Sequence, residues 1–435
     1  MKEKFKTCTY LEDALYVAPN EIRSCCQRFF YEGKMRGDAK LLNINNGITP
    51  KTLDIQNARK KIFDEIQENL NEDCKGCIYL KNSNKEPQFT SETKFLSIEH
   101  HSVCNLRCDY CSEIYWGGKR SKYDVVKFIS QLSQEGALNN CNQVVWGGGE
   151  PTLDKSFEKI FEEIHKIANP NIYHRVFTNS VRFSEPLAKF LKLGMVKITT
   201  SVDSGTEETF KKIRGREKFF DVFTNLQKYS EIDSTKITVK YIFTADNFEE
   251  KEIDSFVSNC KKFELHNCNY QISVNYKNEK LEFRILKSIA YLFFRLYENN
   301  IRKIFLDDHI MFSFISLNEE DLNNLKEYLS IYNASKILLD PLNIKDLFVY
   351  GSGEIATQII TKTNFFKMVK NFDLIDSNPE ITGKQILNRN ILPPTDINKV
   401  DKPIFIASAQ HYDEIYKKII QIKGDANSII SGLIV

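Results

Sequence analysis

The stretch Cys104-Asn-Leu-Arg-Cys108-Asp-Tyr-Cys111 places three cysteines in a CxxxCxxC run directly after the apolar segment Phe95–Ile98. Three closely spaced thiolates can bind three irons of a [4Fe–4S] cube, which is normally held by four protein thiolates. No fourth cysteine follows at a similar spacing. One iron would therefore stay open to an exchangeable ligand, which indicates a cluster that takes part in chemistry as well as carrying electrons.

The same three cysteines have two other interpretations, as buried core residues or as a zinc site. Cysteines flanked by Asn, Arg and Asp are poor core material. Zinc ligand pairs usually read CxxC or CxxCH. The spacing therefore favours an iron–sulfur cluster.

Four short motifs follow the cysteines in a regular order. Val144–Pro151 reads VVWGGGEP, Ile172–Ser180 reads IYHRVFTNS, Val196–Asp203 reads VKITTSVD and Lys211–Gly215 reads KKIRG. Glycines let a backbone approach a ligand closely, and a carboxylate beside them can receive an ammonium group. The series therefore predicts a cradle for a small polar cofactor.

With these motifs the chain resembles the radical SAM enzymes, whose signature is CxxxCxφC with an aromatic residue at the position of Tyr110. The other segments are similar to the family's GGEP, TNG, S-x-D-G and D-x-x-R-G motifs, although the Asp of the last one is missing here. The resemblance implies that S-adenosylmethionine (SAM) chelates the open iron of a [4Fe–4S] cluster. The implied cluster ligands are Cys104, Cys108 and Cys111, and the implied cofactor contacts are Tyr110, Gly148, Gly149, Glu150, Asn179, Ser201, Asp203 and Arg214.

The resemblance also implies a role for several of these side chains. Glu150 would receive the methionyl amine. Ser201 and Asp203 suit the carboxylate and the ribose hydroxyls of the cofactor, and Arg214 would face the carboxylate. Lys240 and Asn275 lie on or just after predicted strands and are further candidates for the substrate cavity.

The polar motifs that follow apolar runs lie at the C-terminal ends of predicted strands, where active sites collect in parallel α/β barrels. The hydrophobic pattern predicts strands near 95–100, 143–146, 172–177, 196–201, 236–243 and 269–274. Helical periodicity intervenes near 122–135, 155–168, 184–193, 206–213, 219–230 and 248–262. Because six βα units cannot close an eight-stranded barrel, we expect an α/β fold built on a partial (β/α)6 TIM-type barrel over residues 93–290.

Five cysteines precede the predicted barrel. Cys74-Lys-Gly-Cys77 is a CxxC with a glycine turn, which makes a two-ligand clamp for a metal. Cys8 and Cys25 flank the segment Tyr16–Ile22, which predicts a strand–turn–strand hairpin able to bring the two thiols together. Cys26 stands directly beside Cys25.

This N-terminal pattern resembles the SPASM/twitch auxiliary-cluster module of radical SAM enzymes, which in most relatives follows the barrel. We expect an auxiliary [4Fe–4S] cluster on Cys8, Cys25, Cys74 and Cys77 in a module of residues 1–92, with Cys26 as the true second ligand or a bystander. A structural zinc site on the same thiolates is the alternative. Met1-Lys-Glu-Lys is followed by no apolar segment, so we expect a cytoplasmic protein without a signal peptide.

A second series of motifs begins near residue 343, after a mostly helical connector predicted over residues 291–342. Leu347–Ala356 reads LFVYGSGEIA, which predicts a strand, a Gly-x-Gly-x-x-Ala turn and a helix. Phe372–Ile375 is a second strand that ends at Asp376, about where the acid of a Rossmann fold meets a ribose hydroxyl. Ile404–Ser408 supplies another strand. The glycines would let a phosphate approach the helix N-terminus, whose free N–H groups favour an anion.

Residues 343–435 resemble small Rossmann-like modules of bacterial surface-sugar and nucleotide-sugar enzymes, which share the YGxGxxG turn, a D-x-(D/N)-P turn and a later I-A-S strand. The resemblance implies that Gly351, Gly353 and Asp376 contact a nucleotide or nucleotide-sugar. A docking domain with an empty pocket is the alternative.

The composition excludes several classes of function. The 435 residues carry a net charge of +2 with both signs interspersed, which gives no indication of nucleic acid as a partner. No apolar run approaches the length of a membrane span. The basic run Arg59-Lys60-Lys61 is expected on a solvated helix face.

The resemblance implies an enzyme that cleaves SAM reductively to a 5′-deoxyadenosyl radical, which abstracts hydrogen from a substrate C–H bond. It also implies a flavodoxin- or ferredoxin-type electron donor. From the C-terminal domain we expect a sugar or nucleotide-sugar substrate in surface polysaccharide biosynthesis, with oxidation, epimerisation or bond formation as the net reaction. One alternative is a maturase of a ribosomally made peptide. Alternatives from other classes are a non-catalytic Fe–S redox sensor or scaffold and a zinc-stabilised hydrolase or transferase.

Overall fold

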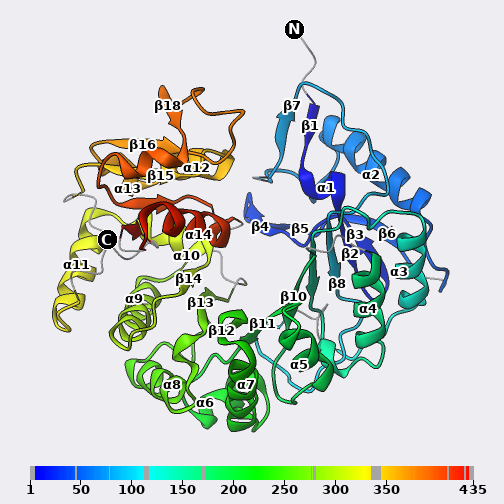
Figure 1. Cartoon of the computed structure of the whole chain (residues 1–435), viewed down its shortest axis with the longest axis horizontal. Coiled ribbons are helices and arrows are strands. Elements are labelled where there is room, and N and C mark those ends of the chain that lie inside the picture. Colours follow the sequence, from blue (N-terminus) through cyan, green and yellow to red (C-terminus); the bar gives the residue numbers. More distant parts are fainter. Residues whose placement is uncertain are drawn as a thin grey trace. The chain divides into compact units, whose positions relative to one another are not determined.

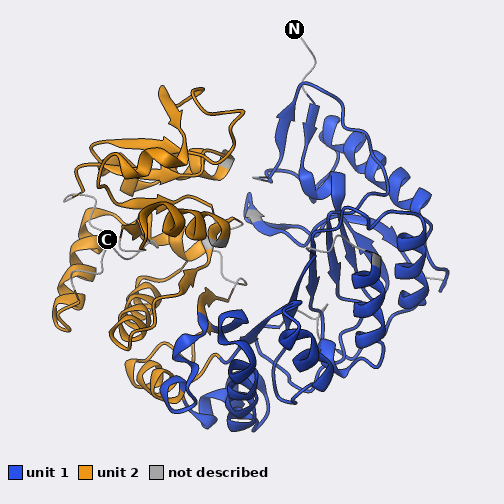
Figure 2. Cartoon of the chain, in the orientation of Figure 1, with its two compact units in different colours: residues 1–202, 206–240, 260–269 blue, residues 203–205, 241–259, 270–435 orange. Residues whose placement is uncertain are grey.

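The computed structural model describes residues 5–44, 47–77, 79–111, 117–167, 172–275, 277, 281–334, 344–408, 411–425 and 428–430. The chain divides into two compact units (Figure 2). Unit 1 comprises residues 1–202, 206–240 and 260–269, and unit 2 comprises residues 203–205, 241–259 and 270–435.

The predicted parallel strands are present (Figure 1). They are β8 (Phe95–Ile98), β9 (Gln143–Trp146), β10 (Tyr173–Phe177), β11 (Val196–Ser201) and β12 (Ile237–Phe243), and β12 passes from unit 1 into unit 2 after Lys240. Each of these strands pairs in parallel with the next, so their C-terminal ends form a common edge. In unit 2, β13 (Asn269–Val274) pairs in parallel with β14 (Ile304–Leu306).

Helices connect these strands near the predicted positions. They are α3 (Val125–Gln134), α4 (Phe157–Ile167), α5 (Glu185–Lys192), α6 (Glu207–Arg214), α7 (Phe219–Asp233) and α8 (Glu250–Lys262). Side chains at the N-caps of three of them, Asp124, Ser184 and Thr206, accept a hydrogen bond from a backbone N–H of the first turn. Such caps satisfy donors that have no partner inside the helix.

One face of the unit 1 strands packs on the helices. Trp146 and His174 are buried, and Phe161 of α4 stacks between His174 and Phe190 of α5. Burial lowers the pKa of His174 to about 3, and its Nδ1 accepts a hydrogen bond from Trp146 Nε1 at 3.1 Å. The side chains that alternate with these residues point to the opposite face, because successive residues of a strand face opposite sides.

The N-terminal segment extends the same sheet. The predicted hairpin is present as β2 (Ala14–Val17) and β3 (Glu21–Arg23), and β6 (Lys40–Asn43) pairs with β3. β2 pairs in parallel with β8, with Tyr16 opposite Ser97. The hairpin therefore continues the barrel sheet, which the sequence did not predict.

The other elements of the N-terminal segment surround this hairpin. They are β1 (Phe5–Thr7), α1 (Thr9–Asp13), β4 (Arg28–Tyr31), β5 (Lys34–Gly37), α2 (Thr52–Gln67) and β7 (Lys81–Ser83). A small core made by Leu11, Ile62, Phe63 and Ile66 joins α1 to α2 and includes the side chain of Cys8.

Unit 2 contains a second sheet in the strand order β17-β18-β16-β15-β19-β20. Its strands are β15 (Leu347–Tyr350), β16 (Phe372–Ile375), β17 (Gln385–Ile386), β18 (Arg389–Leu392), β19 (Ile404–Ile406) and β20 (Ile429–Ile430), all parallel except β17. The helices of the unit are α9 (Phe283–Glu298), α10 (Asp308–Ile315), α11 (Glu319–Ser330), α12 (Glu354–Lys362), α13 (Asn364–Met368) and α14 (Tyr412–Lys423). Two apolar clusters pack this sheet, one around Phe365 and Phe405 and one around Ile397 and Ile419.

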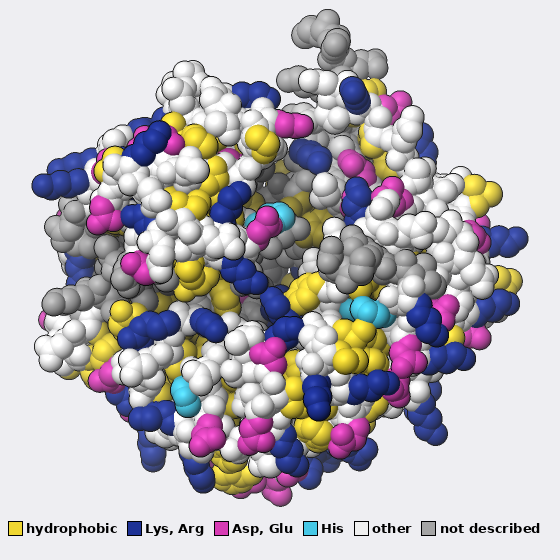
Figure 3. Space-filling model, in the orientation of Figure 1, with side chains coloured by type: hydrophobic (Ala, Val, Ile, Leu, Met, Phe, Trp, Pro, Cys, Tyr) yellow, Lys and Arg dark blue, Asp and Glu magenta, His cyan; other side chains and the backbone are white. Residues whose placement is uncertain are grey.

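The charged surface follows the composition. Lys and Arg side chains alternate with Asp and Glu over the face in view in Figure 3, as expected from a net charge of +2. Among the helices of the described residues, none has both the length and the apolar character needed to cross a membrane.

The expectation for Arg59 is wrong, because this side chain of α2 is fully buried. Its Nη1 donates to the carbonyls of Thr90 (2.6 Å) and Glu92 (3.0 Å), and its Nη2 donates to the carbonyl of Ala14 (2.9 Å). Burial lowers the pKa of Arg59 to about 10. The guanidinium therefore fixes α2 to β2 and to the segment that enters β8.

Replacing Arg59 by Met tests this anchor. We expect Arg59→Met to lower the free energy of unfolding by about 1–3 kcal/mol, because three carbonyls, among them that of the buried Ala14, lose their donors. Scanning calorimetry measures the effect. Lys61→Met is the matched control, because that side chain is 77% exposed and its replacement should change little. Equal stability of the two variants would contradict the role of Arg59 as a buried anchor of α2.

Candidate active site

The loop of Cys104, Cys108 and Cys111 follows β8, and all three residues are half-buried. The Sγ atom of Cys104 accepts hydrogen bonds from the Leu106 N–H and from Asn179 Nδ2, both at 3.5 Å. Asn179 Nδ2 also donates to Asn105 Oδ1 at 2.7 Å. The predicted cofactor residue Asn179 therefore holds the cysteine loop to the end of β10.

The same loop lies against the C-terminal end of α6. The N–H groups of Arg107 and Asp109 donate to the carbonyls of Arg214 (3.0 Å) and Ile213 (2.9 Å). Gly215 ends α6 at a φ of 73°, and a Cβ there would lie 2.8 Å from the Arg107 carbonyl oxygen. Glycine is thus required both by the left-handed turn and by the close approach of the loop.

Two predicted cofactor residues meet at this contact. Arg214 is buried, and its Nη1 donates a hydrogen bond to the hydroxyl of Tyr110. Its guanidinium lies 5.8 Å from the centroid of the Tyr110 ring. The KKIRG segment, which lacks the Asp of the family pattern, is thereby joined to the cysteine loop.

Gly148 and Gly149 pack directly against the chain that leads to Cys104. A Cβ on Gly148 would lie 2.7 Å from the His101 carbonyl oxygen, and one on Gly149 would lie 2.2 Å from the Val103 carbonyl oxygen. The Gly149 and Glu150 N–H groups donate to those same carbonyls at 2.8 Å. The motif predicts that these glycines approach a ligand, and the structure gives them a second role, which is contact with the cysteine loop.

Glu150 is fully buried, and four donors surround its carboxylate. Oε1 accepts from the Thr152 N–H (3.2 Å), the Thr152 hydroxyl (2.6 Å) and the Thr178 hydroxyl (2.8 Å), and Oε2 accepts from the Asn179 N–H (2.6 Å). Burial raises the pKa of Glu150, although these bonds oppose the rise. A carboxylate offers about four lone pairs, two on each oxygen, so Oε2 keeps capacity for one more donor. Thr152 and Thr178 are not among the predicted cofactor residues, although Thr178 lies inside one quoted motif and Thr152 directly follows another.

Ser201 and Asp203 lie at the end of β11. Ser201 is half-buried and pairs in register with Lys240 of β12. Asp203 is buried at a φ of 62°, and its Oδ1 accepts a hydrogen bond from the Ile242 N–H at 2.8 Å. The Asp203 carboxylate therefore caps a backbone N–H of β12, a structural contact that the motif did not reveal.

A buried polar group precedes the cysteines. His100 Nε2 lies 2.8 Å from Asp154 Oδ2, and the Val103 N–H donates to His101 Nδ1 at 3.2 Å. Burial lowers the pKa of His101 to about 4, so this ring is neutral near pH 7. One ligand atom from each of His100, His101 and Asp154 lies within 4.8 Å of the others, a spacing that a metal ion can bridge. The hydrogen bonds of His100 and His101 explain the same arrangement without a metal ion. The one between His100 and Asp154 joins the segment before Cys104 to the turn after Glu150.

The structure brings Cys8, Cys25, Cys74 and Cys77 together. Burial is the main cause that raises the pKa of Cys8 to about 12, and the thiols of Cys25 and Cys77 raise it further. The pKa of Cys74 is raised by burial and then by Cys25, Cys8 and Cys77. The four thiols therefore lie close enough to repel one another as thiolates.

Cys26 has different neighbours. Burial raises its pKa to about 12, the Glu99 carboxylate adds to the rise, and a hydrogen bond with Tyr16 opposes it. Cys25 adds to the raised pKa of both Cys8 and Cys74. Cys25 therefore lies near the thiols of Cys8 and Cys74, and Cys26 lies near Glu99 and Tyr16.

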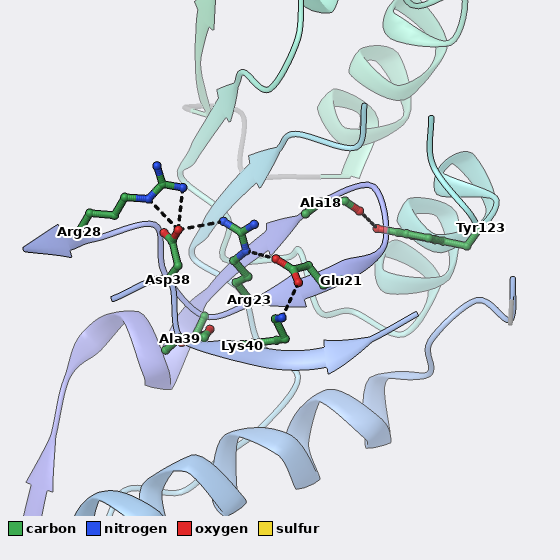
Figure 4. Close-up of polar contacts among 9 residues, drawn as sticks. Ala18, Glu21, Arg23, Arg28, Asp38, Ala39, Lys40 and Tyr123 are labelled. Carbon is green, nitrogen blue, oxygen red and sulfur yellow. Dashed lines mark hydrogen bonds and ion pairs between the residues drawn. The ribbon is translucent and has the colours of Figure 1, made fainter. Parts of the chain in front are cut away.

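An ion-pair network holds the backbone beside Cys25 (Figure 4). Arg23 pairs with Glu21 at 2.5 Å and with Asp38 at 3.4 Å, Arg28 pairs with Asp38 at 2.7 Å, and Lys40 pairs with Glu21 at 2.8 Å. Burial alone would raise the pKa of Glu21, but Lys40 and Arg23 hold it below its usual value. The network fixes β3 and β6 on either side of the cysteine pair.

In unit 2 the turn after β15 is joined to the end of β16. Asp376 Oδ2 accepts from the Ser352 N–H (2.9 Å) and hydroxyl (2.7 Å), and Oδ1 accepts from the Asn378 N–H (2.9 Å). Gly351 adopts a φ of 105°, and a Cβ on Gly353 would meet open space. The acid that the sequence assigned to a ribose therefore also holds the glycine turn itself.

A family model matches the part of the chain that carries the cysteine loop. Residues 98–257 match the model of the Radical SAM superfamily. The chain therefore carries a radical SAM superfamily domain, and that domain places it in a class of enzymes.

Curated relatives match the same part of the chain. A GTP 3′,8-cyclase of Haemophilus influenzae is 30% identical over 172 residues, which cover 39% of this chain and 50% of the relative. A GTP 3′,8-cyclase of Actinobacillus succinogenes is 31% identical over 167 residues, which cover 38% and 49%. The chain thus spans about half the length of the curated relatives it matches.

Solved structures give weaker likenesses. Streptococcus suis SuiB bound to the precursor peptide SuiA has a TM-score of 0.42 at 14% identity, covering 65% of this chain and 63% of that one. The structure of anSMEcpe with bound AdoMet has a TM-score of 0.38 at 21% identity, covering 48% and 63%. TM-scores below 0.5 are too low to establish a shared fold.

The neighbouring glycines of the GGGEP segment allow a matched test of the loop contact. We expect Gly149→Ala to lower the iron bound by the cysteine loop, because its Cβ would lie 2.2 Å from the Val103 carbonyl and displace the chain before Cys104. Gly147→Ala is the control, because its Cβ would make an ordinary contact of 3.7 Å with Glu99. Iron and sulfide analysis after anaerobic reconstitution measures the difference. Full iron in both variants would contradict the contact.

Proposed function

We propose that the protein cleaves SAM reductively and abstracts hydrogen from a C–H bond of a sugar or nucleotide-sugar in surface polysaccharide biosynthesis. The observation that carries the proposal is the attachment of the Cys104–Cys111 loop to the strand ends that bear Glu150 and Asn179 and to Arg214 of α6. Sites built on such strand ends are typical of parallel α/β barrels.

The cysteine loop suits a [4Fe–4S] cluster held by Cys104, Cys108 and Cys111. When bound, the cluster and SAM supply a 5′-deoxyadenosyl radical, with electrons from a flavodoxin- or ferredoxin-type donor. The Leu106 N–H and the Asn179 side-chain amide donate to the Cys104 sulfur and would stabilise its thiolate form. Hydrogen bonds to cluster sulfurs also tune the reduction potential.

Side chains around the loop suit the amino-acid end of SAM. The Glu150 carboxylate would accept the methionyl ammonium at Oε2, where one lone pair stays available. Arg214, fixed by Tyr110, would face the methionyl carboxylate, and Ser201 would donate to the cofactor from the end of β11. These residues would orient the cofactor and exclude water from it.

The second metal centre in the proposal is an auxiliary [4Fe–4S] cluster on Cys8, Cys25, Cys74 and Cys77, as in a SPASM/twitch module. Mutual electrostatic interaction of these thiols supports the set, and the different neighbours of Cys26 support its exclusion. Thiols with raised pKa values release protons when they bind metal, so metal binding there would strengthen with pH.

The choice of a nucleotide-sugar substrate has two supports. The glycine turn of Gly351 and Gly353 lies at the C-terminal end of parallel strand β15, where Rossmann-like domains bind nucleotides. The curated relatives are named for the cyclisation of GTP, a nucleotide.

The number of clusters is tested by counting iron and sulfide in the anaerobically reconstituted protein. We expect about eight irons per chain, falling to about four in the Cys104→Ala/Cys108→Ala/Cys111→Ala variant. Cys25→Ala should lose the second set of about four, and Cys26→Ala is the control that should keep it. Four irons in the wild type and none in the triple variant, with zinc present, would replace the auxiliary cluster by a zinc site.

The reaction is tested by measuring 5′-deoxyadenosine from SAM and dithionite. We expect nucleotide-sugars to stimulate its release above the rate without substrate, because substrate binding orders the site around the reacting carbon. Stimulation by a peptide substrate alone would favour a maturase. Bound iron with no 5′-deoxyadenosine under any condition would favour a redox sensor and contradict the proposal.

A further inference from the structure

Unit 1 carries five exposed cationic side chains on neighbouring segments of the chain. They are Lys51, Lys119, Arg120, Lys122 and Lys127. Within the parts of the chain that the structure describes, none of them forms an ion pair with a carboxylate. We call these five residues the basic strip. Unpaired surface cations of this kind attract an anionic partner.

The segment 117–122 of the basic strip is fastened to the chain that enters the cysteine loop. Ser102, which is fully buried, lies two residues before Cys104. Its N–H donates to the Lys119 carbonyl (2.8 Å), its carbonyl accepts from the Gly118 N–H (3.2 Å), and its hydroxyl oxygen accepts from the Lys119 N–H (2.9 Å). Three hydrogen bonds to one buried residue therefore fix the backbone of this segment beside the candidate cluster site.

The charge of Arg120 also reaches this buried chain. The pKa of His101 is lowered mainly by burial, then by His100, and the Arg120 guanidinium lowers it further. His101 lies three residues before Cys104. The guanidinium is therefore close enough to the residues that lead into the cysteine loop to act on them electrostatically.

The remaining two lysines extend the basic strip along α3. The Lys122 N–H donates to the Pro19 carbonyl (2.9 Å), and a Cβ on Gly47 would lie 3.2 Å from the Lys122 carbonyl oxygen. The segment that begins at Gly47 thus contacts the chain just before α3. Lys51 of that segment and Lys127 of α3 line one open cavity of about 590 Å³. The five cations therefore lie on segments that contact one another.

Carboxylates near the basic strip are fewer than its cations. Asp54 and Asp124 lie at the N-terminal ends of α2 and α3, where each accepts a backbone N–H and is partly offset by the positive end of the helix. Glu135 caps the other end of α3 and also lines the cavity. On the cysteine loop the exposed residues Arg107 and Asp109 offset one another. The strip therefore keeps a positive surplus, and its three cations nearest the cysteine loop lie in a segment without a carboxylate.

The position of the basic strip favours an electron donor over other anionic partners. A donor protein keeps its redox group bound, so it needs an exposed surface close to the group that it reduces. The strip meets both conditions, because its side chains are exposed and its backbone is bonded to Ser102. A chain with a net charge of only +2 offers little general attraction to a polyanion such as nucleic acid, so the surplus is a local feature.

We propose that the basic strip is the docking surface for an acidic electron-transfer protein that reduces the cluster held by Cys104, Cys108 and Cys111. The proposal rests on the proposed function for the existence of that cluster, and it adds the surface at which the electron donor binds. The step moves one electron: the flavin or iron–sulfur group of the donor is oxidised, the cluster is reduced, and no covalent bond forms or breaks. Carboxylates of the donor would pair with the strip, which speeds association and orients the two proteins.

The surface is tested by carbodiimide cross-linking, which joins a lysine to a carboxylate that contacts it. The full-length reconstituted protein is mixed with a bacterial flavodoxin and, separately, with a bacterial ferredoxin, and peptide mass spectrometry identifies the linked lysines. We expect links at Lys119 and Lys122 and none at Lys166 or Lys192, which are exposed lysines in the last turns of α4 and α5. Those helix ends lead into β10 and β11, at the opposite ends of the strands from the cysteine loop. The links should disappear at about 1 M salt, where the screening length is about 3 Å.

Charge reversal gives a second readout, the dissociation constant of the donor measured by titration calorimetry. We expect Lys119→Glu/Arg120→Glu to raise it by about tenfold or more, because two attractive charges become repulsive. Lys166→Glu/Lys192→Glu makes the same change in net charge and should leave it unchanged. Lys119→Arg/Arg120→Lys keeps the charge and should keep most of the affinity. The iron content of each variant checks that it is intact.

Four outcomes would overturn the proposal. Neither donor forms a salt-sensitive complex; the links fall on Lys75 beside the N-terminal cysteines instead of the basic strip; charge reversal in the strip weakens binding no more than the control does; or RNA or an acidic peptide binds the strip more tightly than either donor.

These measurements need no SAM cleavage, so the two proposals can fail separately. Failure here, with 5′-deoxyadenosine still formed from SAM and dithionite, would leave the proposed function standing. A salt-sensitive complex linked through Lys119, in a protein that does not cleave SAM, would leave the docking surface standing.

Discussion

The carboxylate of Glu150 is the group on which the arrangement of the candidate site depends. It is fully buried, and it accepts hydrogen bonds from the turn after β9 and from the end of β10 at once. The Asn179 whose N–H it binds also reaches the Cys104 sulfur. Removing a carboxylate from water costs several kcal/mol unless hydrogen-bond donors compensate. The buried Glu150 carboxylate therefore depends on its four donors, and these donors are held in place by the carboxylate.

The pH dependence of this group follows from its burial. Burial raises the pKa of Glu150 in the folded protein above its usual value of 4.5. The folded state therefore holds this proton more tightly than the unfolded state. The contribution of Glu150 to stability is greatest below pH 4.5 and falls as the pH rises through its folded pKa. Above that pKa the ionised side chain is retained at a cost in stability, a pattern typical of functional carboxylates.

Much of the fold could be predicted from local patterns. The strands predicted for the barrel, the hairpin of Tyr16–Ile22 and the strand–turn–helix at Leu347–Ala356 lie where apolar runs and turn residues predict them. The parallel strand β14 lies in the segment predicted as a helical connector and was missed. The predicted features depend on residues that are close together in the sequence, so the pattern of a single sequence is enough to predict them. The radical SAM domain was predictable for the same reason, because its motifs are short and ordered.

The contacts that were missed join distant segments. Arg59 in a basic run is buried because three carbonyls far along the chain converge on it. Gly149 contacts the Val103 carbonyl, and Asp376 accepts hydrogen bonds from Ser352. The partners are far apart in the sequence, so helix or strand periodicity does not predict these contacts. The proximity of Cys25 to Cys8 and Cys74 likewise depends on segments that are far apart in the sequence. Spatial convergence of this kind is set by tertiary packing and not by local propensity.

The most direct test of the account is electron–nuclear double resonance on the reduced protein with SAM labelled by ¹⁵N at the methionyl amine and ¹³C at the carboxylate. We expect hyperfine couplings from both labels to the cluster held by Cys104, Cys108 and Cys111, because its open iron is where SAM would bind. A reduced cluster that shows neither coupling, in protein that binds SAM, would contradict the central claim.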